Sequence, residues 1–241
     1  MPSPQGERKR LQYLVSALQE GLPEGLLNLS LYGEAASEAY RPGTSPLTTV
    51  LVLDDMRPER LALLRGILRR RRLRKLPIPL LMDPAYMETS LDVFPLEFLQ
   101  IVDRHRTLLG DSGTFAGLEF DACNLRREVE QQLKGKLLHL RAAYLQVGTS
   151  RRSLLKLLTA TPADFEIILR GMLYLADRER PERSDALLDN VEQAYSIQLP
   201  TLRRLQHARA GGRKLERAQA ETLIHAYLIE ARDLARLVDA L

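Results

Sequence analysis

Hydrophobic and polar residues follow two different periods along this chain, and the change falls near residue 121. Before residue 121, short apolar runs have the length and composition of β-strands, and stretches with helical spacing lie between them. After it, apolar side chains recur every three or four residues, which is typical of amphipathic helices. The sequence therefore predicts an α+β chain, with a small mixed β-sheet and helices at 1–120 and an all-α bundle at 121–241. The predicted strands are 27–32, 48–53, 77–82 and 98–102, and the predicted helices of the first half are 8–20, 34–40 and 58–75.

The predicted strands differ in how their residues alternate. Run 27–32 alternates apolar and polar residues with a period of two, which predicts a strand with one buried face. Run 48–53 is almost continuously apolar and rich in β-branched residues, so it predicts a strand covered on both faces. In run 77–82, Pro77 and Pro79 lack the backbone N–H that a central strand must donate, so this strand is expected at an edge of the sheet.

Composition and charge limit the classes of molecule that this protein is expected to bind. The chain has 241 residues, of which 45% are hydrophobic and 27% charged, an ordinary composition for a globular protein. Its 35 Lys and Arg against 31 Asp and Glu give a formal charge of +4, a mild excess and not the footprint of a dedicated nucleic-acid binder. Aromatic residues make up 5% of the chain and Trp is absent, so stacking platforms for single-stranded bases are not expected.

Cysteine usage and hydropathy indicate a compartment. Cys123 is the one cysteine of the sequence, so no disulfide can form within the chain, which favours a reducing compartment. No apolar run approaches the roughly 20 residues that span a bilayer. The polar N-terminus also lacks the apolar core of a signal peptide. The sequence therefore predicts a cytoplasmic protein without a membrane partner.

The segment 31–53 has a distinctive order of features. The pair Tyr32-Gly33 ends the first predicted strand and is followed by a short Ala-rich helix. The turn Arg41-Pro42 and then Ser45 lead into the apolar strand. In this order and spacing, the segment resembles the signature region of the polymerase-beta-like (minimal) nucleotidyltransferase family. The resemblance implies the nucleotidyltransferase-like α/β fold over about half of the chain, followed by the C-terminal helical bundle that is usual in that family.

The same resemblance reveals three departures from the catalytic motif. In the family, Gly-Ser follows the first strand and Ser-Asp-x-Asp opens the second, where the two carboxylates hold Mg²⁺ ions that bridge the nucleotide phosphates. Pro46 and Thr48 stand at the two carboxylate positions of this chain, and Glu34 stands at the first serine. Proline has no side-chain ligand, a neutral hydroxyl cannot replace a carboxylate for a hard dication, and Glu34 would repel a triphosphate. The resemblance thus implies a degenerate motif, whose nucleotide-facing residues are Gly33, Glu34, Ser45, Pro46 and Thr48.

Basic residues gather in one stretch at the end of the predicted helix 58–75. Its members are Arg65, Arg69, Arg70, Arg71, Arg72, Arg74 and Lys75. The four consecutive arginines of this stretch are the predicted anion-binding residues, for phosphate or RNA. The alternative is a solvated outer face, because the helix dipole also favours cations at a helix C-terminus. A second basic set allows the same two interpretations and consists of Arg203, Arg204, Arg209, Arg213, Lys214 and Arg217.

Other titratable residues form no recognisable metal motif. The four histidines lie far apart and lack metal-ligand spacing. Asp54 and Asp55 are adjacent, so on a continuing strand they would face opposite sides. We interpret them as a polar strand exit before the turn at Pro58.

Three hypotheses of function remain open. The first is a nucleotidyltransferase-fold protein that has lost catalysis and serves a binding or regulatory role, with a nucleotide or a protein as partner and no cofactor. The second is an active nucleotidyltransferase whose Mg²⁺ site is built from other carboxylates. The candidate ligands for that site are Glu34, Asp83, Asp92 and Asp103. The third is a basic module whose helical half binds RNA or a protein.

Overall fold

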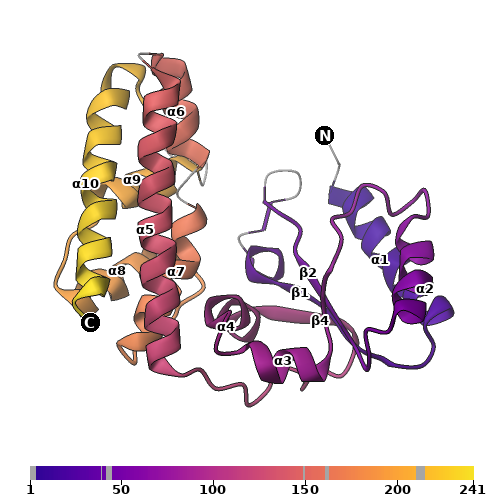
Figure 1. Cartoon of the computed structure of the whole chain (residues 1–241). Helices are drawn as coiled ribbons and strands as arrows, with labels where there is room; N and C mark the ends of the chain where they lie inside the picture. Colours follow the sequence, from indigo (N-terminus) through magenta and orange to yellow (C-terminus); the bar gives the residue numbers. More distant parts are fainter. Residues whose placement is uncertain (1–3, 39, 42–44, 149, 161–162, 210–214) are drawn as a thin grey trace. The chain divides into compact units, whose positions relative to one another are not determined.

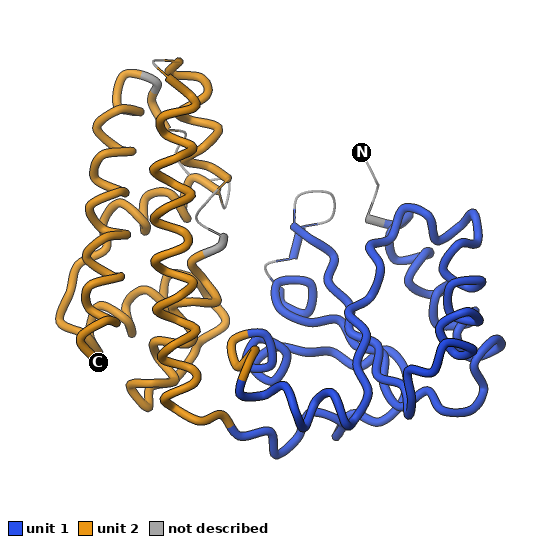
Figure 2. The backbone as a smooth tube through the Cα atoms, viewed as in Figure 1, with its two compact units in different colours: residues 1–92, 97–119 blue, residues 93–96, 120–241 orange. Residues whose placement is uncertain are grey.

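The computed structural model describes residues 4–241 with the exception of 39, 42–44, 149, 161–162 and 210–214. The chain divides into two compact units (Figure 2). Unit 1 comprises residues 1–92 and 97–119 and contains the sheet, whereas unit 2 comprises residues 93–96 and 120–241 and is helical.

Four short strands form one sheet in unit 1 (Figure 1). The strand order is β3-β2-β1-β4, with β1 antiparallel to both β2 and β4, and β2 parallel to β3. The sheet is mixed and β3 lies at an edge, both as predicted. The strand is shorter than the predicted 77–82, because it begins only after Pro77 and Pro79. The strands are β1 (Leu26–Tyr32), β2 (Thr49–Leu53), β3 (Leu80–Met82) and β4 (His105–Gly110).

One face of the sheet is covered by two helices, α1 (Pro4–Gly21) and α2 (Pro58–Leu68) (Figure 1). Leu18 of α1 and Leu29 of β1 are fully buried in this layer, together with Leu51 of β2. Each such leucine contributes about 1.5–3 kcal/mol through removal of apolar surface from water. The two helices that the apolar spacing predicted therefore hold the sheet from one side.

Strand β1 is buried on both faces, whereas its alternation predicted only one buried face. Asn28 and Ser30 are completely buried although they are polar. Ser30 Oγ donates to Asn28 Oδ1 over 2.7 Å, and Asn28 Nδ2 donates to the Asp111 carbonyl over 2.7 Å. A polar residue can occupy a central strand when its hydrogen-bonding groups are paired inside the protein, and these are.

The predicted strand 98–102 is wrong, because these residues belong to helix α4 (Pro95–Asp103). Most of the apolar side chains of this helix are buried, and a short apolar run fits a buried helix as well as a buried strand. Glu128 accepts the backbone N–H of Leu96 over 2.8 Å, which satisfies a free donor of the first helical turn. That contact comes from a distant part of the sequence and has no local signal.

The sequence pattern also missed two elements of unit 1. Strand β4 carries a mixed sequence, His-Arg-Thr-Leu-Leu-Gly, and pairs with β1 at the second edge of the sheet. Helix α3 (Pro84–Ser90) is capped by Asp83, whose side chain accepts the backbone N–H of Tyr86 over 2.7 Å. No residue of β4 is fully buried, so no continuous apolar run marks this strand in the sequence.

Two predicted helices are shorter than expected. Helix α2 ends at Leu68, and residues 69–76 form successive turns. Arginines three and four residues apart repel one another in a continuing helix, which favours its end at this point. In place of the predicted helix 34–40, the described residues form a single 3₁₀ turn, η1 (Gly33–Ala36), and residue 39 lies outside the described residues.

Unit 2 consists of helices, as predicted. The longest of them buries one face at the expected spacing, with Leu125, Val129, Leu133, Leu137 and Leu140. No strand occurs in the described part of residues 121–241. Among the described residues, no helix is long and apolar enough to cross a membrane. The helices are α5 (Ala122–Val147), α6 (Arg151–Ala160), α7 (Ala163–Leu175), α8 (Ser184–Tyr195), α9 (Pro200–Arg209), η2 (Arg217–Gln219) and α10 (Ala220–Asp239).

Helix α9 begins against a carboxylate supplied by α10. Glu230 accepts the backbone N–H of Thr201 over 2.7 Å and that of Leu202 over 2.9 Å. We expect Glu230→Ala to lower the free energy of unfolding by about 1–2 kcal/mol, because two helix-terminal donors lose their anionic partner. Glu221→Ala, at an exposed position of the same helix, should cost no more than about 0.5 kcal/mol. Urea denaturation followed by far-ultraviolet circular dichroism measures both, and equal losses would contradict this assignment.

Candidate functional site

The segment that resembles a nucleotidyltransferase motif turns sharply at Gly33, directly after β1. Gly33 has a φ of +60°, and its N–H donates to the Arg104 carbonyl over 2.9 Å. A Cβ atom at this position would lie 2.6 Å from Gln100 Nε2. The positive φ and the close approach both favour glycine, and they place η1 against the end of α4.

This turn brings Tyr32 beside the residues that precede β2. The Tyr32 N–H donates to the Thr48 carbonyl over 3.2 Å, and Thr48 Oγ1 donates to the Tyr32 carbonyl over 2.5 Å. The Thr48 hydroxyl is therefore bound to the backbone of β1. Pro46, two residues earlier, is exposed and has no polar side-chain atom. The two positions that carry carboxylates in the family provide no anionic oxygen here.

The neighbouring strand adds no carboxylate at this end of the sheet. Strand β3 runs parallel to β2, with Val50 beside Leu80. Continued toward the start of both strands, this register places the Pro-Ile-Pro segment 77–79 beside the residues that precede β2. None of these side chains can ligate a metal. The residues present do not fit the Mg²⁺ ions that the family resemblance implies.

Glu34 lies in η1 and faces Ser45. Ser45 Oγ donates to Glu34 Oε1 over 2.6 Å and accepts the backbone N–H of Arg41 over 3.1 Å. Ser45 is buried and Glu34 is partly buried. Hydrogen bonds to a carboxylate are short and strong, so this contact joins Glu34 of η1 firmly to Ser45. The structure therefore brings together Glu34 and Ser45, two residues of the degenerate motif.

A second carboxylate and a phenol, which the sequence pattern did not indicate, lie near Glu34. Burial raises the pKa of the Tyr40 phenol, and the carboxylates of Glu7 and Glu34 raise that pKa further. Glu7 comes from α1 and is only 9% exposed. The carboxylates of Glu7 and Glu34 therefore both lie near one phenol in this corner.

The side chain of Tyr32 joins the turn to α4. Tyr32 Oη donates to Glu97 Oε1 over 2.8 Å. Burial raises the pKa of the Tyr32 phenol, and the charge of Glu97 raises it further. Tyr32 therefore stays protonated and serves as a fixed hydrogen-bond donor in this corner.

The carboxylates considered as alternative metal ligands come from different elements of unit 1. Asp83 is the N-cap of α3, Asp92 is exposed after that helix, and Asp103 is the last residue of α4. Glu34 is bound to Ser45 in η1. Among the residues that the structure describes, no group of three or more His, Cys, Asp or Glu side chains is arranged to hold a metal ion.

Asp54 and Asp55 follow β2 at its opposite end. Arg60 Nη2 lies 3.1 Å from Asp54 Oδ1 and 3.5 Å from Asp55 Oδ2. Arg57 donates to Asp55 from its side chain and from its backbone, and these hydrogen bonds lower the pKa of the Asp55 carboxyl. Both aspartates thus form ion pairs where β2 ends. This agrees with their interpretation as a polar strand exit.

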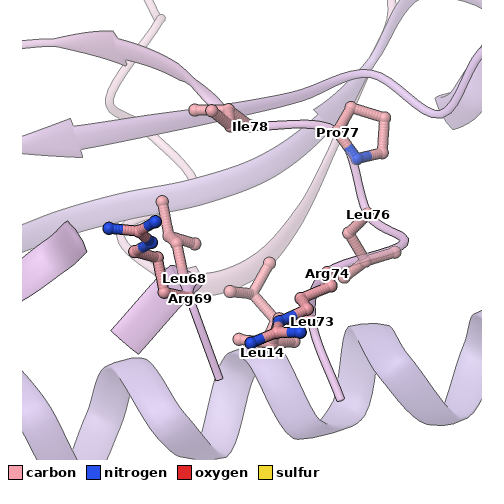
Figure 3. Close-up of a pocket in the computed structure, with 8 residues that line it drawn as sticks. All are labelled: Leu14, Leu68, Arg69, Leu73, Arg74, Leu76, Pro77 and Ile78. Carbon is pink, nitrogen blue, oxygen red and sulfur yellow. The ribbon is translucent and has the colours of Figure 1, made fainter. Parts of the chain in front are cut away.

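The arginines predicted to bind anions border two different hollows of unit 1. Arg71 and Arg72 line a hollow of about 610 Å³, and Arg69 lines another of about 460 Å³ (Figure 3). Arg70 is exposed and lines neither of the two. The described residues of segment 33–48 line neither hollow, so these arginines and the degenerate motif are separate features. The first hollow is completed by Lys9, Arg10, Tyr13 and Lys75.

Part of the second basic set, the one that begins at Arg203, forms ion pairs within unit 2. Arg203 Nη2 lies within 2.8 Å of two carboxylates of α8. His207 Nε2 lies 2.7 Å from Asp185 Oδ1 of the same helix. These contacts connect α8 to α9. Arg213 and Lys214 lie outside the described residues.

The fold of the whole chain is similar to that of a solved nucleotidyltransferase. The crystal structure of spectinomycin adenyltransferase AAD(9) from Enterococcus faecialis, with ATP and spectinomycin, matches with a TM-score of 0.52 over 96% of this chain and 99% of that chain. This chain has a nucleotidyltransferase-like fold. The sequence identity is 11%, so the similarity concerns the fold alone. No family model and no curated protein matches the sequence.

Several residues around the nucleotidyltransferase-like motif were not indicated by the sequence. Glu7, Gln100 and Arg104 reach the turn from α1 and from the end of α4, which are distant in sequence. For the hollow of about 610 Å³ that Arg71 and Arg72 line, called the basic hollow from here on, the sequence contained a weak signal. Lys9 and Tyr13 are four residues apart on a predicted helix, which places them on one face of it.

Proposed function

We propose that this protein keeps the nucleotidyltransferase-like fold, has lost nucleotidyl transfer, and serves a binding or regulatory role. The observation that carries the proposal is the Thr48 hydroxyl, which donates to the Tyr32 carbonyl where the family resemblance places a metal-binding carboxylate. Pro46, at the other carboxylate position, has no ligand atom. Nucleotidyl transfer requires fixed anionic oxygens that hold cations against the triphosphate, and these two residues supply none.

The charge around the turn supports the same proposal. The solved structure with a similar fold contains ATP. In this chain, a triphosphate at the turn after β1 would approach the carboxylate of Glu34, with that of Glu7 near the Tyr40 phenol. Like charges a few ångströms apart repel strongly when both are partly shielded from water. This corner is therefore a poor site for phosphates.

We expect the full-length protein to transfer no nucleotide from ATP, GTP, CTP or UTP in the presence of Mg²⁺ or Mn²⁺. The expectation rests on the missing anionic ligands at Pro46 and Thr48. Incubation with radiolabelled nucleotides and candidate acceptors, together with a Mn²⁺ titration followed by electron paramagnetic resonance, measures transfer and metal binding. Metal-dependent labelling that disappears in Glu34→Ala would overturn the proposal in favour of an enzyme with a divergent site.

A matched variant makes this test independent of the acceptor. Pro46→Asp combined with Thr48→Asp places two carboxylates two residues apart before β2, where both project to the same side. We expect Mn²⁺ binding in the presence of ATP to tighten by about tenfold or more. Asp54→Asn combined with Asp55→Asn, at the other end of β2, should leave Mn²⁺ binding unchanged. A folded Pro46→Asp/Thr48→Asp variant that gains no Mn²⁺ binding would contradict the register on which the proposal rests.

A further inference from the structure

Five cationic side chains surround one hollow on unit 1. The hollow has a volume of about 610 Å³ and is open to solvent. Two of the cations come from α1 and three from the turns that follow α2, so distant parts of the sequence meet here. The lining residues are Lys9, Arg10, Tyr13, Arg71, Arg72 and Lys75.

A buried leucine fixes the turns that carry three of these cations. Leu73 is 2% exposed and lies in the same core cluster as Leu14 of α1. Because Leu73 is anchored in the core, the charged residues on either side of it stay at the surface. Arg72 is held in addition by Tyr13, with its guanidinium carbon 5.2 Å from the ring centroid. The basic hollow is therefore formed by ordered backbone and not by a loose chain of arginines.

The charges of the basic hollow are not neutralised within the protein. Among the described residues, none of its five cations has an ion-pair partner. Other cations of the chain differ in this respect, because Arg60 and Arg203 each contact two carboxylates. Five like charges around one hollow repel one another, and a bound polyanion would relieve that repulsion. The convergence of five cations from two distant segments on one hollow distinguishes it from isolated solvated charges such as Arg151 and Arg152.

Positive charge also extends beyond the hollow. Arg69 and Arg74 flank the neighbouring hollow of about 460 Å³, whose other lining residues are apolar (Figure 3). Arg65 and Arg70 are exposed on the same stretch of chain. A single small anion would use only part of this surface. The distribution fits an extended ligand whose negative charges repeat along its length.

We propose that this surface binds the phosphate backbone of a double-helical nucleic acid without reading its sequence. Lysine and arginine bind backbone phosphates, and such contacts carry no base specificity. The one aromatic ring of the hollow, Tyr13, is partly buried and has Arg72 over its face, so it offers no free platform for an unstacked base. A protein partner would need apolar or aromatic anchors at the centre of the contact. Tyr13 is the one such residue in the described lining of the basic hollow, and the apolar side chains lie to one side, in the neighbouring hollow of about 460 Å³.

The test uses the full chain and fluorescence anisotropy with a labelled RNA duplex of about 20 base pairs and the equivalent DNA duplex, over a range of KCl concentrations. We expect Arg71→Gln combined with Lys75→Gln to weaken binding at low salt about tenfold or more. The slope of log K against log salt should fall in magnitude by about 2, because two phosphate contacts are lost. The control is Arg151→Gln combined with Arg152→Gln, which removes the same charge from exposed positions of α6 and should change neither quantity.

The outcomes are distinct. An equal loss in the control variant would assign binding to net charge and overturn the proposal. A wild-type protein that prefers an acidic peptide, anionic phospholipid vesicles or an unstructured strand to both duplexes would overturn it as well.

Tyr13→Leu, which removes the ring under Arg72, should weaken binding and leave the salt slope unchanged, and a changed slope would contradict the positioning of Arg72. Circular dichroism and thermal unfolding verify that each variant is folded. None of these measurements depends on metal binding at the degenerate motif.

Discussion

Replacing Gly110 with alanine should destabilise unit 1 by about 2–4 kcal/mol. Gly110 ends β4 with a φ of +88° and pairs with Asn28 of β1. A Cβ atom at this position would overlap the carbonyl oxygen of Leu27 and lie 2.8 Å from its carbonyl carbon. These are backbone atoms of a central strand, so no side-chain rotation can relieve the overlap. The same Leu27 carbonyl accepts the N–H of Asp111 over 3.0 Å. That hydrogen bond would also be lost if the carbonyl moved away from the added Cβ atom.

Two neighbouring glycines provide matched controls for Gly110→Ala. Gly117 has a φ of +77°, but a Cβ atom added there would meet no atom within 4 Å, so Gly117→Ala isolates the backbone strain, about 1 kcal/mol. Gly113 does not have a positive φ, and the nearest atom to its Cβ position lies at 3.4 Å, so Gly113→Ala should be nearly neutral. Urea denaturation gives the order of losses, and hydrogen exchange locates them in β1 and β4. A loss at Gly117 as large as that at Gly110 would contradict the role of the Leu27 overlap.

Replacing Arg170 with methionine should destabilise unit 2 by about 3–5 kcal/mol. Arg170 of α7 has a side chain that is only 3% exposed. Its Nη1 donates to the Arg180 carbonyl over 3.2 Å and its Nη2 to the Pro181 carbonyl over 2.6 Å, which fixes the connection between α7 and α8. Glu166, one helical turn earlier, has a carboxylate oxygen 3.8 Å from Arg170 Nε. Methionine would leave both carbonyls without this donor and the carboxylate without this cation.

Arg170→Lys and Arg178→Met separate the causes of that loss. Lysine keeps the charge but cannot donate to two carbonyls in the forked geometry of a guanidinium, so its loss should be intermediate. Arg178 is exposed, and Arg178→Met should change stability by less than about 0.5 kcal/mol. Urea denaturation measures the losses, and hydrogen exchange over residues 176–183 reports the connection. Equal losses of stability for lysine and methionine at position 170 would show that the two guanidinium hydrogen bonds to the carbonyls are not important.

Local periodicity was sufficient to predict much of the fold. The continuous apolar run in β2 and the four-residue spacing along α5 correspond to elements at the predicted places. The prolines before β3 correctly predicted an edge strand. Each of these signals depends only on which faces of one element are buried, and a sequence records that directly.

The errors in the predicted fold have causes outside the local sequence. The residues of α4 were predicted as a strand, because a short buried apolar run has no period that distinguishes the two structures. The first turn of α4 is capped by Glu128 of a later helix, and β4 is ordered by pairing with β1. Asn28 and Ser30 are buried because they bond to each other and to Asp111. Only the tertiary structure supplies these partners.

For the candidate sites too, some features were determined by the sequence and others only by the tertiary structure. The sequence by itself determined that Pro46 and Thr48 cannot supply carboxylates, because ligand chemistry depends on residue identity alone. Only the tertiary structure decided that the Thr48 hydroxyl binds a backbone carbonyl and that Glu7 lies near Tyr40. It also decided that cations of α1 join those after α2 around one hollow. The electrostatic potential at a point depends on how close the charges lie to it in space, not on how close they lie in the sequence. A local pattern of charges therefore could not reveal the basic hollow.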